Sequence, residues 1–185
     1  MKSWKTILLV AIGLLGMGGY LFAKRDKSNH SEGIHWVTVE QANELMKKHP
    51  KKVYVDIYTD WCGWCKVMDK KTFSHAEVIK YMNANYYCIH MNAENTDEII
   101  HQGKTYGVEG KNNALAVTWM QGKMSYPTSV FMDENFENPQ PVPGYLEVNM
   151  MESIVKYIAE NKHKTTPFDQ WQNEFKPTWS KEESK

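Results

Sequence analysis

The sequence has few cysteines and no excess of charge of either sign. Its 185 residues include only three cysteines, too few for a disulfide-rich scaffold. The 22 Lys+Arg are balanced by 22 Asp+Glu, so no overall basic field favours nucleic acid as a partner. Internal repeats and low-complexity segments are also absent, and 42% hydrophobic residues make the chain too apolar to be disordered. A compact domain remains, in which the spacing of the cysteines matters more than their number.

One long uncharged run is present, over residues 7–23, preceded by Lys2 and Lys5 and followed by a basic cluster. It is close to the shortest length that spans a bilayer and slightly longer than the apolar region of a usual signal peptide. We therefore expect residues 1–23 to be a signal peptide or an N-terminal membrane anchor, and 24–35 to be a linker. The protein is then exported and periplasmic, either soluble or anchored to the inner membrane. A buried core helix is the alternative for the same run.

Helices and strands are expected to alternate along the rest of the chain, which is typical of α/β domains. Apolar residues at helical spacing predict helices, and β-branched or aromatic runs predict strands. Two segments, Thr38–Gln41 and Ser74–Glu77, resemble capping boxes that begin helices. The expected helices lie near 38–49, 62–71, 74–82, 98–106 and 148–160, and the expected strands at 53–58, 86–91 and 126–132.

Cys62 and Cys65 form a Cys-x-x-Cys pair where an expected buried strand is followed by a helix. Cys62 falls at the helix N-terminus, where free N–H groups and the helix dipole favour a thiolate. Cys65 lies one turn further along, close enough to form a disulfide, and is expected to be the less exposed of the two. The first thiol can then attack a substrate disulfide, and the second can resolve the mixed disulfide. The spacing predicts redox chemistry.

Other interpretations of the cysteines are a structural zinc site, an inert disulfide and haem attachment. A structural zinc site needs about four ligands, for which Cys88, His75 and His90 are available beside the pair. An inert structural disulfide also stays open, although a bond across two residues constrains little chain. Attachment of c-type haem needs a histidine after the second cysteine, where Lys66 stands, and is excluded. Cys88 is expected to be a buried strand residue.

The segment Val55–Cys65, Val-Asp-Ile-Tyr-Thr-Asp-Trp-Cys-Gly-Trp-Cys, resembles the active-site segment of thioredoxins. Its continuation to Met82 is similar to an exported subgroup, the thioredoxin-like thiol-disulfide interchange proteins, which includes the C-terminal periplasmic domain of the DsbD reductase. Tyr106–Val108 and Tyr126–Thr128 also match the family, in the same order. The resemblance covers residues 36–160 and implies a thioredoxin fold, with a central mixed sheet flanked by helices.

The resemblance implies roles for individual residues. Cys62 is expected to be the nucleophile, Cys65 the resolving thiol, and Asp56 the buried acid that takes the proton of the resolving thiol. Pro127 is expected to be cis and to face the cysteine pair. A strand residue facing water is the alternative for Asp56. The expected substrate-binding residues are Trp61, which would pack beside the disulfide, together with Gly63, Trp64, Tyr126 and Pro127.

The sequence departs from thioredoxin at three places. Trp64 stands where thioredoxin has a proline. An insert over 111–125 precedes the cis-proline loop, and it would either shape a partner-binding surface or be a peripheral addition. His90 lies near the position where thioredoxin has a lysine beside the buried acid, and a histidine there could tune Asp56.

We expect a thioredoxin-like domain over 36–163 and a C-terminal extension over 164–185, which folds back onto the domain or docks on a partner. The expected activity is that of a protein-disulfide oxidoreductase, a reductase rather than an oxidase. Its partners would be protein thiols and disulfides and a membrane electron donor or redox partner protein. No nucleic acid, metal or cofactor beyond the Cys62–Cys65 disulfide is expected. The alternative is a thioredoxin-fold binding or chaperone module with incidental thiols.

Overall fold

The computed structural model describes residues 33–179. The expected signal peptide or anchor over 1–23, and most of the expected linker over 24–35, lie outside the described residues. In the described part of the chain, no helix is both long and apolar enough to pass through a bilayer.

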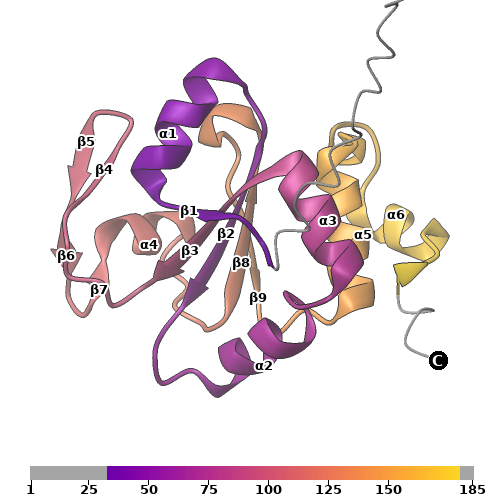
Figure 1. The fold of residues 1–185 in the computed structure, drawn as a ribbon, viewed down its shortest axis with the longest axis horizontal. Coiled ribbons are helices and arrows are strands. Elements are labelled where there is room, and N and C mark those ends of the chain that lie inside the picture. Colours follow the sequence, from indigo (N-terminus) through magenta and orange to yellow (C-terminus); the bar gives the residue numbers. More distant parts are fainter. Residues whose placement is uncertain (1–32, 180–185) are drawn as a thin grey trace, which may run out of the picture. The chain divides into compact units, whose positions relative to one another are not determined.

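A five-stranded sheet forms the centre of the described domain, and helices pack against both of its faces (Figure 1). The strand order is β1-β3-β2-β8-β9, in which the first three strands are parallel, β8 is antiparallel to β2, and β9 is antiparallel to β8. This mixed sheet between helices confirms the predicted α/β fold. Its strands are β1 (Trp36–Val37), β2 (Lys52–Tyr58), β3 (Tyr86–Asn92), β8 (Thr128–Met132) and β9 (Gln140–Pro143).

The helices divide between the two faces of the sheet. α1 and α4 pack with the apolar residues of one face, and α2, α3 and α5 pack with those of the other. The bounds are α1 (Val39–Lys48), α2 (Gly63–Lys71), α3 (Ala76–Asn85), α4 (Ala114–Trp119), α5 (Val148–Ala159) and α6 (Phe168–Glu174), with short 3-10 helices η1 (Glu134–Phe136) and η2 (Lys162–Lys164).

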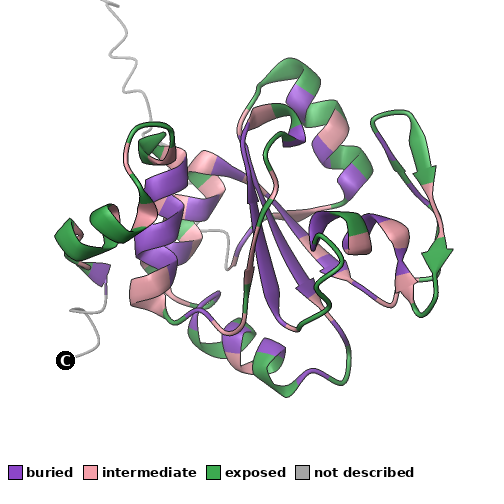
Figure 2. Cartoon of the chain, turned by 180° about the vertical axis from the view of Figure 1, so that it is seen from behind, coloured by how far each residue is buried: buried purple, intermediate pink, exposed green. Residues whose placement is uncertain are grey.

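The central strand β2 is buried along almost its whole length, as Figure 2 shows. Successive residues of a strand point to opposite faces of the sheet. Val53, Val55 and Ile57 therefore join one core, while Tyr54 joins the other. Asp56 points to the same face as Tyr54. A strand covered on both sides has an apolar sequence throughout, so a carboxylate within it stands out.

The start of α1 follows its sequence signal. Thr38 Oγ1 accepts a hydrogen bond from the Gln41 backbone N–H at 3.1 Å, and Gln41 Oε1 accepts one from the Thr38 backbone N–H at 2.9 Å. The capping box predicted at Ser74 is wrong, because α3 begins after His75 without a side-chain capping bond. The Ser74 hydroxyl donates instead to the backbone carbonyl of Lys70 at 2.6 Å, so it satisfies the end of the preceding helix.

The predicted helix over 98–106 is wrong. This segment forms a hairpin of β4 (Ile99–His101) and β5 (Lys104–Tyr106). Its turn residues Gln102 and Gly103 have φ angles of 49° and 78°, as a two-residue hairpin turn requires. The spacing of the apolar residues favours a helix, whereas Gly103 indicates a turn.

The insert expected over 111–125 contains β7 (Asn112–Asn113) and α4, and β7 pairs with β6 (Val108–Glu109). Asn113 is fully buried, and its Oδ1 accepts a hydrogen bond from the Leu115 backbone N–H at the start of α4. The backbone N–H of Asn113 also donates to the carbonyl of Ala93 at 2.7 Å. The insert is therefore attached to the loop that follows β3.

The described part of the C-terminal extension folds back onto the domain, which is the first of the two expectations for it. Trp171 in α6 donates through Nε1 to the backbone carbonyl of Ser153 at 3.1 Å. Trp179 is buried, and its backbone N–H donates to Glu152 Oε2 at 3.0 Å. Glu152, which is fully buried in α5, also accepts hydrogen bonds from the backbone and the side chain of Thr178. One carboxylate thus holds the last described residues of the extension.

Glu152→Gln is expected to lower the free energy of unfolding by about 2 kcal/mol at pH 7, because charge-assisted hydrogen bonds to a buried carboxylate are lost. Burial by itself raises the pKa of Glu152, but the bonds from Lys156, Trp179 and Thr178 outweigh it and lower the pKa below the ordinary 4.5. The stabilisation is therefore present above pH 4.5 and is lost as the pH falls through the lowered pKa.

Urea unfolding of the wild type and the variant, from pH 7 downward, measures both effects. The two unfolding free energies should differ at pH 7 and converge in acid. The matched control is Glu160→Gln, an exposed residue at the end of the same helix. An equal loss in the control, or none in Glu152→Gln, contradicts the argument.

Candidate functional site

The cysteine pair lies between the end of β2 and the first turn of α2. Cys62 and Cys65 are joined in a disulfide, with their Cα atoms 5.4 Å apart. Cys62 is the N-cap of α2, and its Sγ accepts a hydrogen bond from the Cys65 backbone N–H at 3.1 Å. In the reduced pair, this N–H and the positive end of the helix dipole would stabilise a thiolate on Cys62.

The two cysteines do not differ in exposure as expected. The sequence predicts that Cys65 is the more sheltered residue, but both cysteines are 4% exposed. The bond itself is the reason, because it holds both sulfurs at the same end of α2. The residues around them are more accessible: Trp61 and Trp64 are 66% and 62% exposed, and Gly63 has open space where a side chain would project. We call the exposed rings of Trp61 and Trp64 the aromatic rim. A partner protein contacts this rim before it contacts the disulfide.

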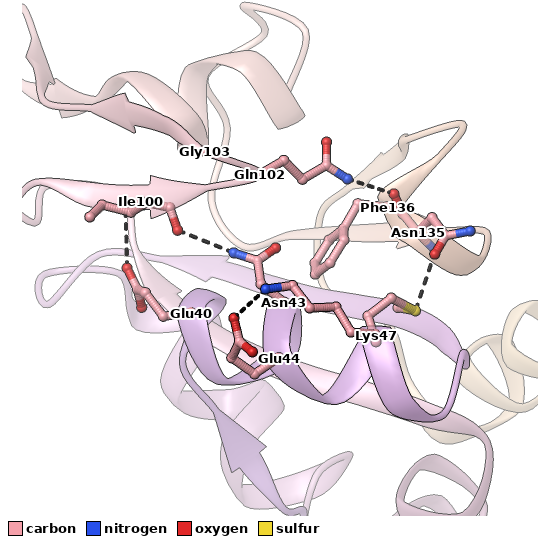
Figure 3. A pocket seen from close by; sticks show the side chains of 10 residues that line it. Glu40, Asn43, Glu44, Lys47, Ile100, Gln102, Gly103, Asn135 and Phe136 are labelled. Atoms are coloured by element: carbon pink, nitrogen blue, oxygen red, sulfur yellow. Dashed lines mark hydrogen bonds and ion pairs between the residues drawn. The ribbon is translucent and has the colours of Figure 1, made fainter.

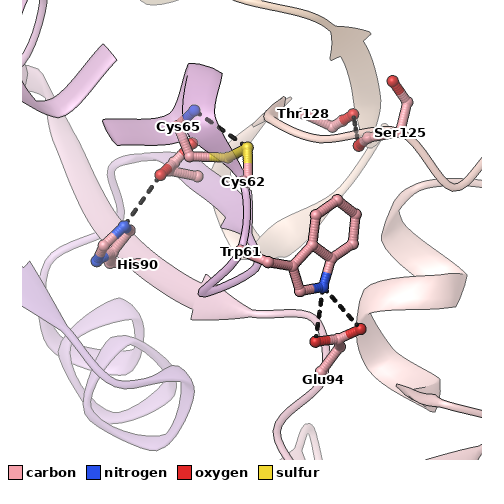
Figure 4. Close-up of a disulfide and its surroundings, with 8 residues drawn as sticks. Trp61, Cys62, Cys65, His90, Glu94, Ser125 and Thr128 are labelled. Atoms are coloured by element: carbon pink, nitrogen blue, oxygen red, sulfur yellow. Dashed lines mark hydrogen bonds and ion pairs between the residues drawn. A yellow bond between two sulfur atoms is a disulfide. The ribbon is translucent and has the colours of Figure 1, made fainter. Parts of the chain in front are cut away.

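Trp61 is held beside the disulfide by two partners, of which Glu94 is shown in Figure 4. Its Nε1 donates to both carboxylate oxygens of Glu94, at 3.2 and 3.1 Å. Its ring meets the Tyr126 ring edge-on, with 5.8 Å between the centroids. The Tyr126 hydroxyl donates in turn to Asn112 Oδ1 at 2.8 Å. The insert thus contacts the residue that precedes Pro127, and supports the site instead of lying apart from it.

The Tyr126–Pro127 peptide bond is cis. The carbonyl of Pro127 accepts a hydrogen bond from the Gly144 backbone N–H at 2.8 Å, which ties this loop to the end of β9. Trp64 stacks on Tyr145, with 5.7 Å between the ring centroids. These residues line a shallow hollow of about 260 Å³ made of Trp64, Tyr126, Pro127, Gly144 and Tyr145. It has room for a side chain of a partner next to the cysteine pair.

Asp56 is 1% exposed, so the alternative of a strand residue facing water is wrong. The parallel register of β2 and β3 sets His90 directly opposite it. His90 Nε2 lies 3.1 Å from Asp56 Oδ2, within ion-pair distance but without the geometry of a hydrogen bond. His90 is among the side chains that surround the disulfide in Figure 4, where a dashed line marks this contact. The predicted closeness of His90 to the acid is confirmed.

The environment of Asp56 disfavours its charged form. Burial raises the pKa of Asp56 above the ordinary 3.8; His90 opposes the rise, and the negative charge of Asp69 adds to it. Because burial is the largest of these effects, the pKa is raised. A carboxyl group of this kind holds a proton closer to neutral pH, which suits the acceptance and release of a thiol proton.

Asp56, Asp69 and His90 are also the one group of possible metal ligands found within residues 33–179, with their ligand atoms within 4.8 Å of one another. The zinc site considered from the sequence shares only His90 with this group. Its cysteine pair is joined in the disulfide, and Cys88 is a free, buried thiol in β3. Burial raises the pKa of Cys88, so this thiol stays protonated. The prediction of a buried strand cysteine is confirmed.

A second hollow, of about 580 Å³, is lined by residues that include Asn43, Ile100 and Phe136 (Figure 3). It is lined by α1, the β4–β5 hairpin and η1, and by none of the predicted site residues, all of which the structure describes. The polar groups in it bind one another: the Ile100 backbone N–H donates to Glu40, and Asn43 donates to the Ile100 carbonyl. These bonds attach the hairpin to α1, and we assign this hollow no chemistry.

The structure adds three residues that the sequence did not single out. Glu94, Asn112 and Tyr145 contact the predicted aromatic residues of the site. Each lies on a loop or a short strand well separated along the chain from the cysteine pair. Neither composition nor spacing marks them, because such partners depend on how distant loops return to the same edge of the sheet.

Comparison with known sequences places these features in a family. The family model Thioredox_DsbH, described as a protein of unknown function, DUF255, matches residues 20–159, more than half of the 185 residues. The chain is also 30% identical over 104 residues to the thiol:disulfide interchange protein DsbD of Campylobacter jejuni strain RM1221. That match covers 53% of this chain and 18% of DsbD, so the chain spans less than a fifth of the length of this relative.

Two solved structures share the fold. A thioredoxin-fold protein from Helicobacter pylori has a TM-score of 0.52 at 15% identity, over 72% of this chain and 91% of that one. A DsbH oxidoreductase has a TM-score of 0.51 at 14% identity, over 74% and 92%. At these identities the likeness concerns the fold, and it confirms the predicted thioredoxin fold.

Asp56→Asn is expected to stabilise the oxidised protein increasingly as the pH rises above 4. The pKa of Asp56 is higher in the folded protein than the ordinary 3.8, so the unfolded chain loses this proton first and rising pH favours unfolding. An asparagine side chain does not titrate in this range, so the variant lacks this pH-dependent loss of stability. The gain in unfolding free energy should therefore grow with pH up to the raised pKa and then become constant.

Urea unfolding at each pH unit from 4 to 8 measures this gain. Asp60→Asn, at an exposed position two residues after the same strand, is the matched control and should show no growth with pH. A constant difference between Asp56→Asn and the wild type across this range is incompatible with a raised pKa.

Proposed function

The chain belongs to the Thioredox_DsbH family of thioredoxin-like disulfide oxidoreductases, and we propose that it exchanges disulfides with protein substrates through Cys62 and Cys65, as a reductase outside the cytoplasm. The observation that carries the proposal is the place of Cys62 as the N-cap of α2, with its Sγ accepting the Cys65 backbone N–H. An inert disulfide has no need of this position, and a bond across two residues stabilises little of the chain.

The reaction begins with the reduced pair. The Cys62 thiolate attacks one sulfur of a substrate disulfide, whose S–S bond breaks; one substrate sulfur leaves as a thiolate and the other is joined to Cys62. Cys65 then loses its proton and attacks the sulfur of Cys62, which releases the second substrate thiolate and forms the Cys62–Cys65 disulfide. The substrate gains two electrons, and its thiolates take up two protons from solvent.

Asp56 is the group that takes the proton of Cys65 in this proposal. It lies in the strand that leads directly into the cysteine pair, and its contact His90 is part of the surroundings of the disulfide in Figure 4. Burial raises the pKa of Asp56, which brings its proton affinity closer to that of a thiol.

The aromatic rim is the surface that a partner protein would contact. Trp61 and Trp64 are large apolar side chains left exposed on either side of Gly63. Tyr126 and Pro127 line the hollow beside them. Exposed apolar patches of this kind mark protein interaction sites. The proposed partner is therefore a protein segment that carries a cysteine, and no nucleic acid, metal or bound cofactor takes part.

The reductase direction is proposed from the resemblance of the active-site segment to the exported interchange proteins and from the buried acid Asp56, and the compartment is proposed from the apolar run near the N-terminus. The relative from Campylobacter jejuni is named a thiol:disulfide interchange protein. In the proposal, a membrane electron donor or a redox partner protein reduces the pair again after each cycle. The uncharged run over 7–23 directs export, as a signal peptide or as an anchor.

Cys62→Ser is expected to lose all turnover in insulin reduction, because the attacking sulfur is missing. Cys65→Ser should still attack and then stall as a mixed disulfide with its partner, which a non-reducing gel detects. Cys88→Ala is the matched control and should keep full turnover, since Cys88 is free and buried. Full activity in cells of a variant lacking both Cys62 and Cys65 would instead favour a binding or chaperone module.

The direction of exchange is tested by the reduction potential of the pair. The protein is equilibrated in glutathione and dithiothreitol buffers, and its thiols are counted by mass spectrometry. A potential near about −270 mV, as for thioredoxin, is expected for a reductase, whereas about −120 to −180 mV belongs to an oxidant or isomerase and would overturn the direction.

A further inference from the structure

We propose that His90 carries the proton between the buried Asp56 and the solvent. The inference rests on the proposed function and adds to it a path by which Asp56 recovers its charge after each cycle. Its basis is geometric. The register of β2 and β3 pairs Asp56 with His90, and Nε2 of the ring lies 3.1 Å from Oδ2 of the carboxylate.

The two side chains lead from the interior to the surface. The side chain of Asp56 is 2% exposed and that of His90 is 29% exposed. The other carboxylate oxygen of Asp56, Oδ1, is buried and has no hydrogen-bond partner among the described residues. A proton on Asp56 therefore has little direct access to water. The imidazole ring of His90 contacts the Asp56 carboxyl group and is partly exposed to solvent.

Aromatic neighbours hold the ring of His90 in this orientation. It stacks on Tyr58, with 4.0 Å between the centroids and 20° between the planes. The ring centroid of Trp36 lies 5.0 Å away, and its plane is tilted by 30°. Contacts with two rings restrict rotation of the imidazole, so that Nε2 stays close to Oδ2 of Asp56.

The other titratable groups around Asp56 are less suited to this task. Asp69, on α2, is exposed, and its negative charge favours the protonated form of Asp56. Burial raises the pKa of Tyr54 and, with help from neighbouring carboxylates, that of Tyr58, so neither hydroxyl ionises near neutral pH. Imidazole is the side chain that accepts and releases protons in this range.

The proposed step moves one proton and no electrons. After Cys65 has given its proton to Asp56, that proton passes from Oδ2 to Nε2 of the neutral His90 ring. The resulting imidazolium loses a proton from its other nitrogen to water, and proton exchange with water then returns the neutral ring to the tautomer whose Nε2 is an acceptor. Asp56 is left as a carboxylate, ready to take the next proton from Cys65.

His90→Ala is expected to slow the resolution of the mixed disulfide about tenfold between pH 6 and 8, a modest share of what general acid–base groups contribute. Molecules that start with Asp56 protonated must lose that proton before Cys65 can react. Resolution is followed by acid quenching and mass spectrometry of the mixed disulfide after the reduced full-length protein is mixed with a disulfide-bonded peptide. Added imidazole should restore the rate in proportion to its concentration, because it enters the space of the missing ring.

The wild type and His35→Ala, which changes an exposed histidine, should show no dependence on imidazole. His90→Gln fills the space that His90→Ala opens, so it should be slow and weakly restored. A wild-type rate in His90→Ala overturns the proposal. So does a slow rate that imidazole does not restore, since that result means a structural role.

Asp56→Asn separates this inference from the proposed function. Its resolution should be slow and should not respond to imidazole, because there is no proton for imidazole to remove. If Asp56→Asn fails to slow resolution while Cys62→Ser abolishes exchange, the proton path fails and the exchange activity stands. If Cys62→Ser retains exchange, the proposed function itself fails.

Discussion

The pairing of β2 with β3 on one side and with β8 on the other is the constraint on which the site depends. β2 leads into Cys62, β3 carries His90, and β8 begins just after Pro127. Because β3 is parallel to β2 and β8 is antiparallel, these three residues come to one edge of the sheet. The register matters as much as the order: a slip of one residue would pair Asp56 with an apolar neighbour of His90 and turn the two side chains to opposite faces.

The ionisable side chains near the two ends of β2 differ in how completely they are bonded. At its start, Lys52 is 3% exposed and is bonded to Asp133, Glu134 and Asn161. Burial alone raises the pKa of Asp133, but the bonds from Lys52 and its other neighbours lower it to about 2. Near its other end, the carboxylate of Asp56 has Nε2 of His90 at 3.1 Å from Oδ2, and its Oδ1 has no hydrogen-bond partner among the described residues. A buried charge whose hydrogen bonds are all made, such as that of Lys52, fits a structural role. A buried carboxyl with an unbonded oxygen beside a reactive disulfide, such as that of Asp56, fits a role in proton transfer.

Two electrostatic environments meet at the disulfide. The start of α2 offers an N–H group to Cys62 and favours negative charge on that sulfur. The core behind it offers Asp56, which burial inclines toward its neutral form. The first environment activates the attacking sulfur, and the second receives the proton of the resolving one. Around them, the ring of Trp61 is held beside the disulfide by Glu94 and Tyr126.

The sequence by itself determined what depends on residues close together in the chain: the buried run of β2, the cap at Thr38 and the place of Cys62 at a helix start. Where two local patterns competed, as over 98–106, the tertiary structure decided for the hairpin, because the turn at Gly103 lets both strands pair. Only the tertiary structure showed that both cysteines are equally buried and that Glu94 and Glu152 hold distant segments. Such contacts form between segments that meet only after folding, so they leave no local pattern to detect.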